Sequence, residues 1–204
     1  QMQYFDAPDV VFAWGENKQV VKASMVSPRV YNAMHSGLQV SEFNKSQKLL
    51  CQTILILAYR TGMRINELAG IKLKNIKNLS DISIVLTPNP YLRLKSSSAK
   101  RRVLLVALLK KDELKILTLF IAQQQRMGAS YLFSQGASRQ PLPTYFFSNL
   151  MRILWDGVLG QDNHNYTFHS FRHTAISQLA LAINGSALAE VMTDYTLDEC
   201  QNIA

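Results

Sequence analysis

The spacing of apolar residues along the chain predicts a succession of helices. Leu49, Leu50, Thr53 and Leu57 fall near one stripe of a helix expected from about residue 44 to 59, which Gly62 would end. "SPRVYNAM", from residue 27, has a typical N-cap serine and first-turn proline, and "INELAGIKL" predicts a short helix. Later helices are expected over about 111–127, 143–158, 168–183, 186–193 and 197–203.

Residues 81–106 have a different pattern. The runs "ISIVL", "YLRL" and "RVLLV" are rich in strand-forming residues and are separated by "TPNP" and "SSSAK", which are typical of turns. They predict a small antiparallel hairpin or three-stranded sheet. No internal repeat is evident. The expected fold is therefore mainly α with a small antiparallel β-sheet (α+β), in one domain.

The charge balance favours a polyanionic partner. The 204 residues include 22 Lys and Arg against 14 Asp and Glu, a net charge of +8. Nucleic acid fits this balance. An anionic membrane surface is the alternative, but the sequence has no basic amphipathic helix, and its longest apolar run, residues 103–109, cannot cross a bilayer. Cys51 and Cys200 match no metal or redox spacing, which suits a reducing compartment.

The helix expected over 168–183 begins with three polar residues on one face. His169, Arg172 and His173 are spaced i, i+3 and i+4. The next positions of that face are apolar, so we expect it to point toward the protein body; they are Ile176, Leu179, Ala180 and Ile183.

Taken alone, this trio has two simple interpretations. Histidines four residues apart resemble half of a zinc site, but Ser170 stands where the glutamate of an HExxH motif would be, and no cluster supplies a third ligand. Alternatively, His173 is a hydrogen-bonded core residue and Arg172 forms a structural ion pair.

A second basic element is "TGMRINEL", residues 61–68. Arg64 follows the helix-ending Gly62 and begins another helix, and Glu67, three residues on, can orient it by ion pairing. A helix N-terminus attracts anions, and a guanidinium adds a planar fork for phosphate oxygens. Alone, Arg64 could equally be a surface charge.

A third element is "LRLKSSSAKRRV". Lys95 lies at a strand end, and Lys100, Arg101 and Arg102 follow a serine-rich turn. A basic hairpin of this kind suits the phosphates of a DNA duplex and is predicted to bind them without reading sequence. In isolation it could be a solvated run of charges.

Together the three elements resemble the tyrosine recombinase (phage integrase) family. The matching residues, in order, are Thr61 to Arg64 with Glu67, then Lys95, then His169 to His173. The resemblance implies the catalytic-domain fold of DNA breaking-and-rejoining enzymes. It implies a catalytic domain over 27–204 that is incomplete at its C-terminus, preceded by 1–26 as a linker or remnant of an N-terminal DNA-clamping domain.

The resemblance also implies a mechanism. A family member attacks a DNA phosphodiester with a tyrosine, forms a 3′-phosphotyrosyl link, and needs neither metal nor nucleotide cofactor. By similarity, Arg64 and Arg172 would clamp the non-bridging oxygens, Lys95 would protonate the leaving 5′-oxygen, and His169 would assist proton transfer. His173 would support the helix.

Two parts of the family pattern are not matched. The third box, a Gly-His or Gly-Trp pair in the family, aligns with Asp194 or Tyr195, of which Tyr195 is the better stand-in because a hydroxyl can donate to phosphate. The nucleophilic tyrosine is expected at or just beyond Ala204. We therefore expect this chain alone to be inactive.

The resemblance further implies double-stranded DNA at a recombination site of a mobile element or resolution system as the partner. We also expect a homotetramer on DNA and a monomer for the free fragment. The expected location is cytoplasmic and nucleoid-associated, without membrane association. Two other functions remain open: a type IB topoisomerase-like enzyme, and a non-catalytic DNA-binding relative that retains the phosphate pocket.

Overall fold

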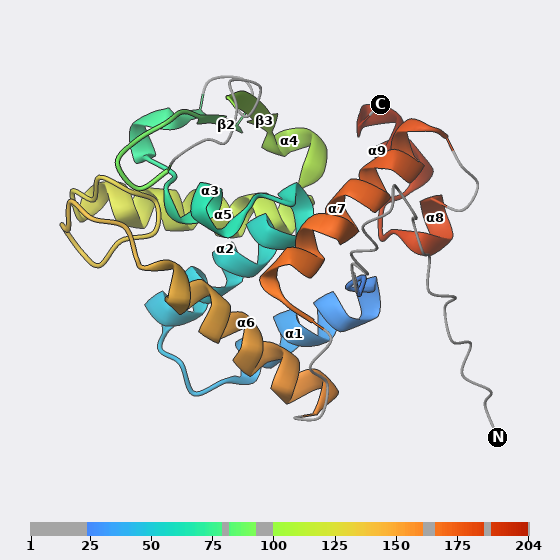
Figure 1. Cartoon of the computed structure of the whole chain (residues 1–204), viewed down its shortest axis with the longest axis horizontal. Coiled ribbons are helices and arrows are strands. Elements are labelled where there is room, and N and C mark those ends of the chain that lie inside the picture. Colours follow the sequence, from blue (N-terminus) through green and yellow to red (C-terminus); the bar gives the residue numbers. More distant parts are fainter. Residues whose placement is uncertain (1–23, 79–81, 93–99, 161–165, 186–188, 204) are drawn as a thin grey trace, which may run out of the picture.

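A buried helix, α2 (Lys45–Thr61), lies at the centre of the structure, a computed structural model that describes residues 24–78, 82–92, 100–160, 166–185 and 189–203 (Figure 1). Asn44 and Gln47 cap its N-terminus reciprocally, each side chain accepting a hydrogen bond from the other's backbone N–H at 3.0 and 2.9 Å. Every residue from 53 to 60 is buried. A helix enclosed in this way needs neighbours on all its sides.

Helices from distant parts of the chain supply those neighbours. They are α1 (Pro28–Val40), α5 (Lys111–Arg126), α6 (Thr144–Leu159) and α7 (Phe168–Ile183), all of which contact α2. Two further helices, α8 (Ala189–Met192) and α9 (Leu197–Ile203), pack against α7. The expected helices are present, and Ser27 caps α1 as predicted, accepting a hydrogen bond from the Val30 N–H. The expected helix over 186–193 begins only at Ala189 in the described residues.

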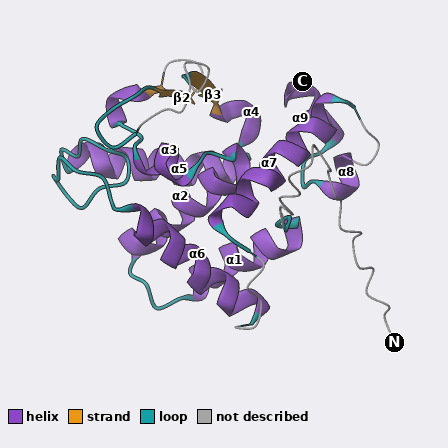
Figure 2. Cartoon of the chain, in the orientation of Figure 1, coloured by secondary structure: helices purple, strands orange, loops and turns teal. Residues whose placement is uncertain are grey.

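A small antiparallel sheet lies over one side of the helical body, beside α3 (Ile65–Ala69), and is the β-structure drawn in Figure 2. Its strands are β1 (Ile76–Asn78), β2 (Ile82–Leu86) and β3 (Arg101–Leu104), in the order β1-β2-β3. Ile84 of β2 pairs with Ile76 on one side and Val103 on the other. The mainly helical fold with a small antiparallel sheet is confirmed.

The strands of the sheet differ from the sequence prediction in three places. A three-residue strand, β1, follows the short 3-10 helix η1 (Leu73–Asn75) and is too brief to show a strand pattern. "RVLLV" is not one strand, because β3 ends at Leu104 and α4 (Leu105–Leu108) follows. Within "YLRL", Tyr91 and Leu92 close a turn on Asn89, and residues 93–94 lie outside the described residues.

The expected orientation of α7 is wrong. Its buried face carries Ser170, Phe171, Thr174, Ala175, Gln178 and Ala182, whereas Ile176 and Ile183 are 51% and 57% exposed. Small side chains allow α7 to approach α2 closely, and the Gln178 amide donates to the Tyr59 hydroxyl at 2.9 Å across the contact. The face with the polar trio therefore borders solvent instead of the core.

The described residues that precede α1 contact α7. The Val26 N–H donates to the Thr174 hydroxyl at 2.8 Å, and Val26 is buried. Residues 1–23, most of the expected linker, lie outside the described residues. Among the helices that the structure describes, none combines the length and apolar character needed to cross a membrane.

Candidate active site

Gly62 joins the end of α2 to the first turns of α7. It ends α2 in the left-handed conformation, at φ +56°, which favours glycine. A Cβ at this position would lie 2.8 Å from the Cβ of Ala175 and 3.3 Å from the Cα of Arg172. The absence of a side chain at Gly62 thus lets two segments 110 residues apart meet.

The same junction positions Arg172. Its Nη1 donates a hydrogen bond of 2.9 Å to the carbonyl oxygen of Gly62, which α2 leaves without a helical partner. Two residues after Gly62, Arg64 is the N-cap residue of α3. The structure therefore brings the two arginine boxes of the sequence together around one glycine.

Glu67 holds Arg64 in place. Its carboxylate accepts the Arg64 backbone N–H at 2.9 Å and the Arg64 guanidinium at 3.3 Å. It also receives two hydrogen bonds, of 3.1 and 2.8 Å, from the guanidinium of Arg101 on β3. The side chain of Glu67 is only 3% exposed, while those of Arg64 and Arg101 are 42% and 32% exposed. One buried acid thus orients two arginines that reach the surface.

The ionisation of Glu67 follows from these contacts. Burial alone would raise the pKa of this carboxyl, but the hydrogen bonds from Arg101 and Arg64 outweigh burial and hold the pKa below its usual value. Glu67 is therefore a charged, fixed counterion at neutral pH.

Positive charge is in excess around this acid. Burial and then the neighbouring Arg64 lower the pKa of Arg172, and Arg101 acts in the same direction, while Glu67 opposes them. Three guanidinium groups thus lie within electrostatic reach of one another, with Glu67 as the carboxylate acting on them. Such an arrangement suits a bound oxyanion.

The two histidines of α7 lie beside the arginines. The rings of His169 and His173 meet edge to face, with their centroids 4.7 Å apart. Burial, then His173, Arg172 and Arg64, lower the pKa of His169, so the exposed imidazole is neutral at pH 7. Within the described part of the chain, Nε2 of His173 is buried without a hydrogen-bond partner.

The residue between them has a structural role. Ser170, at the position of the HExxH glutamate, is buried and accepts the Thr167 N–H at 3.1 Å at the start of α7. No group of three or more potential metal ligands is present among the residues that the structure describes.

The basic hairpin is only partly visible. Lys95 lies outside the described residues. Lys100, the first described residue after it, is exposed. Arg101 and Arg102 are neighbours on β3 and so point to opposite faces of the sheet. Arg101 faces Glu67, whereas Nε of Arg102 donates to the Ser83 hydroxyl on the other face at 2.9 Å.

Asp194 and Tyr195 belong to a different cluster, built on Arg60. This guanidinium is 1% exposed and forms ion pairs with Glu113 at 2.9 Å and with Asp194 at 2.6 Å. Burial alone would lower the pKa of Arg60, but the hydrogen bonds to the two acids raise it above its ordinary value. Lys110 adds a second ion pair to Asp194, at 3.3 Å.

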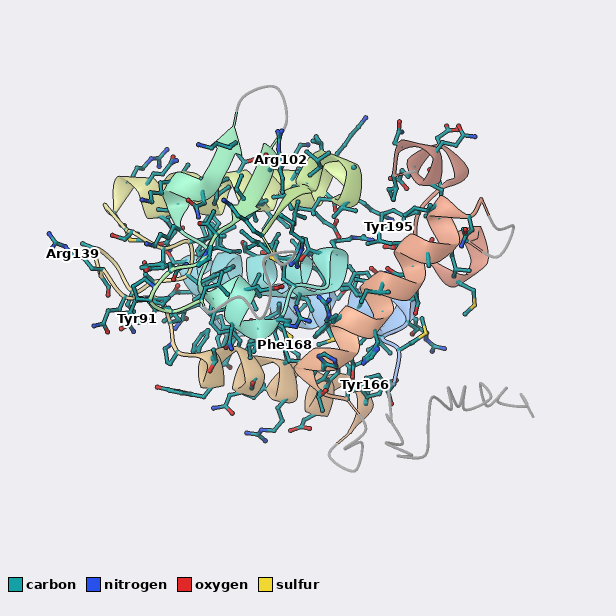
Figure 3. The ribbon with its side chains drawn as sticks, turned by 45° about the horizontal axis from the view of Figure 1, so that its top comes forward. Tyr91, Arg102, Arg139, Tyr166, Phe168 and Tyr195 are labelled. Atoms are coloured by element: carbon teal, nitrogen blue, oxygen red, sulfur yellow. The ribbon has the colours of Figure 1, made fainter. Side chains whose placement is uncertain are left out.

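Tyr195 packs its ring 5.0 Å from the Arg60 guanidinium and donates its hydroxyl to the Leu108 carbonyl at 2.9 Å. Burial raises the pKa of Tyr195 to about 12. Tyr195 lies near the C-terminal end of α7 and Phe168 at its start, so Tyr195 is remote from the histidine-bearing first turns (Figure 3). The sequence signal that could have revealed this cluster is a lone arginine at the end of the buried run "ILILAYR".

Comparison with known proteins identifies the family of this chain. Residues 26–194 match the sequence profile described as the phage integrase family. This chain belongs to the phage integrase family. No curated protein matches the sequence.

Solved structures of recombinases share the fold. A XerH site-specific recombinase in a post-cleavage complex with palindromic difH substrate aligns over 92% of this chain and 51% of its own, with a TM-score of 0.60 and 15% identity. The Tn1549 transposon integrase, in complex with transposon right end DNA, aligns over 92% and 63%, with a TM-score of 0.58 and 19% identity. XerA recombinase aligns over 90% and 61%, with a TM-score of 0.56 and 16% identity. The chain thus spans about half to just under two thirds of the length of these proteins.

Proposed function

We propose that this chain is the catalytic unit of a site-specific DNA recombinase that cleaves and rejoins phosphodiesters through a 3′-phosphotyrosyl intermediate. The observation that carries the proposal is the junction at Gly62. There the Arg172 guanidinium donates a hydrogen bond to the Gly62 carbonyl, two residues before Arg64. Membership of the phage integrase family and the net charge of +8 support double-stranded DNA as the partner.

The two arginines bind the scissile phosphate in this proposal. Negative charge develops on the non-bridging oxygens as the nucleophile attacks, and Arg64 and Arg172 are fixed beforehand by Glu67 and the Gly62 carbonyl. Little reorganisation is then needed at the moment of reaction. Pre-positioned donors of this kind contribute about 3–4 kcal/mol each to transition-state stabilisation.

Proton transfer falls to two other residues. Lys95 is the general acid that protonates the leaving 5′-oxygen, and His169 accepts the proton of the attacking tyrosine. The neutral state of the His169 imidazole at pH 7 supports the second role, because a base must be unprotonated before it acts. His173 supports His169 through their ring contact.

The nucleophile is proposed to be a tyrosine in sequence that follows residue 204. The tyrosines nearest the second arginine box are engaged elsewhere: the Tyr195 hydroxyl is bonded to Leu108, and the Tyr166 ring stacks on Trp155 at 6.0 Å. The active assembly is a homotetramer on double-stranded DNA.

The test uses the full-length protein and a nicked attachment-site duplex. A covalent adduct should accumulate, and mass spectrometry of its peptide should find a tyrosine linked through a phosphate to a 3′-nucleotide. Lys95→Ala should slow cleavage, and a substrate with a better 5′ leaving group should restore the rate in part. If the leaving group has no effect on that variant, Lys95 is not the acid.

The engagement of Asp194 and Tyr195 with Arg60 favours one second candidate. A relative that binds DNA through the same phosphate pocket without cutting it needs no third box. Such a protein would bind the duplex tightly and form no adduct in the same assay.

A further inference from the structure

Arg101 and Arg102 differ in what they contact, although the sequence presents them as one basic run. The Arg101 guanidinium makes two hydrogen bonds to Glu67, the acid that also holds Arg64. The Arg102 guanidinium bonds to Ser83 on the opposite face of the sheet, and Arg102 is exposed. Adjacent strand residues point to opposite faces, so only one of the two can reach the site beside α3.

The burial of the three charged groups points to a site for an anion. Glu67 lies beneath the surface at 3% exposure, and the side chains of Arg64 and Arg101 extend past it to 42% and 32% exposure. A single carboxylate thus serves two guanidinium groups. Arg172 adds a third cation near them, so that among the described residues of this cluster three guanidinium groups are matched with one carboxylate.

We propose that Arg101 is a third guanidinium ligand of the phosphate bound between Arg64 and Arg172, and that Arg102 contacts the flanking duplex instead. This inference rests on the proposed function, which places a phosphodiester at this site. Glu67 accepts hydrogen bonds from the guanidinium groups of both Arg64 and Arg101, and this shared partner holds the two cations beside each other.

In the opposing interpretation, Arg101 orients Glu67 and acts on the phosphate only through Arg64. The two interpretations differ in one respect. A direct ligand contributes even when Arg64 has been replaced, whereas a residue that acts only through Arg64 does not. A double-variant cycle separates them.

The experiment measures binding of sulfate, a tetrahedral dianion, to the 204-residue chain through amide chemical shifts. Arg101→Gln should weaken sulfate binding about tenfold, as loss of one charged hydrogen-bonding partner does, and so should Arg172→Gln. Arg102→Gln should weaken binding of a 20-base-pair duplex and lower its salt slope by about 1 while changing sulfate affinity less than about twofold. Arg152→Gln, which removes an equal charge from the exposed face of α6, controls for long-range effects.

Each outcome decides between the ideas. If Arg172→Gln and Arg64→Gln leave sulfate affinity unchanged, the phosphate site itself is wrong. If these two variants weaken sulfate binding and Arg101→Gln does not, only the role of Arg101 is overturned. It is also overturned if Arg101→Gln has no further effect in the Arg64→Gln background, or if Arg152→Gln weakens sulfate binding equally. A tenfold loss that persists in the Arg64→Gln background supports direct contact.

Discussion

The guanidinium of Arg172 is hydrogen-bonded to the carbonyl oxygen of Gly62 at 2.9 Å, across 110 residues of sequence. This bond fixes an arginine of α7 at the point where α2 ends and α3 begins. The glycine is required twice, for its positive φ and for the close approach of Ala175. The placement of the two arginines proposed to bind phosphate thus depends on how two helices meet.

Replacement of Gly62 should therefore affect both stability and binding. Gly62→Ala adds left-handed strain of about 1–2 kcal/mol and overpacking against Ala175 of about 1–3 kcal/mol. The matched control is Gly128→Ala, which has φ +68° and no neighbour within 4 Å of the added carbon, so it carries the strain alone. Urea unfolding measures the loss of stability in each of the two variants. Equal destabilisation of the two variants would show that the helix contact is not tight.

The buried ion pairs of Arg60 should matter most for stability. Arg60→Met leaves Glu113 and Asp194 without their buried partner, and the free energy of unfolding should fall by about 3–5 kcal/mol. Arg152→Met removes a pair with Asp156 whose arginine is 67% exposed, and should cost under about 0.5 kcal/mol. Chemical denaturation tests both variants. A loss below about 1 kcal/mol for Arg60→Met would contradict the assigned burial.

Glu67 should make stability depend on pH in the acid range. Its pKa is lower in the folded than in the unfolded chain, so its contribution is complete above the unfolded value of about 4.3 and is lost as pH falls through the folded value. The stability difference between the native chain and Glu67→Gln should hence be constant near neutral pH and shrink as the pH falls below about 4.3. Asp194, whose pKa is also lowered by Arg60 against the effect of burial, leaves a residual slope in the variant. A pH-independent difference would contradict the ion pairing.

His169 should report on anion binding. Burial, His173, Arg172 and Arg64 lower its pKa, and a bound sulfate offsets the cationic part, so the pKa of His169 should rise when sulfate binds. By linkage, sulfate affinity should increase as pH falls through the pKa of His169. Proton NMR titration of the imidazole measures this. The control is His35 on α1, whose pKa is lowered first by burial and should not respond. Equal shifts of both histidines would indicate a general salt effect.

The sequence predicts the elements of this fold better than their orientation. The bounds of α7 agree with its pattern, but its apolar residues Ile176 and Ile183 are exposed, because the close contact at Gly62 selects small residues such as Ala175 for the buried face. Hydrophobicity alone does not encode that preference. β1 was missed because three residues carry no alternation.

The candidate site divides in the same way. Arg64, Glu67 and Arg172 were identified from local motifs, and the structure brings them together. The pairing of Arg101 with Glu67 could not be predicted, because it depends on which face of β3 each residue occupies. The lone arginine at the end of "ILILAYR" marks the centre of the Arg60 cluster, but its partners lie 53 and 134 residues away and could not be predicted from local sequence.

Formation of a covalent protein–DNA adduct by the full-length protein tests the central claim most directly. The native protein should form the adduct on a nicked attachment-site duplex, and Arg172→Ala should lower its rate at least about 100-fold while circular dichroism shows a retained fold. Arg152→Ala, on the exposed face of α6, should react at the native rate. Adduct formation by Arg172→Ala at the native rate would contradict the assignment of this arginine pair as the phosphate clamp.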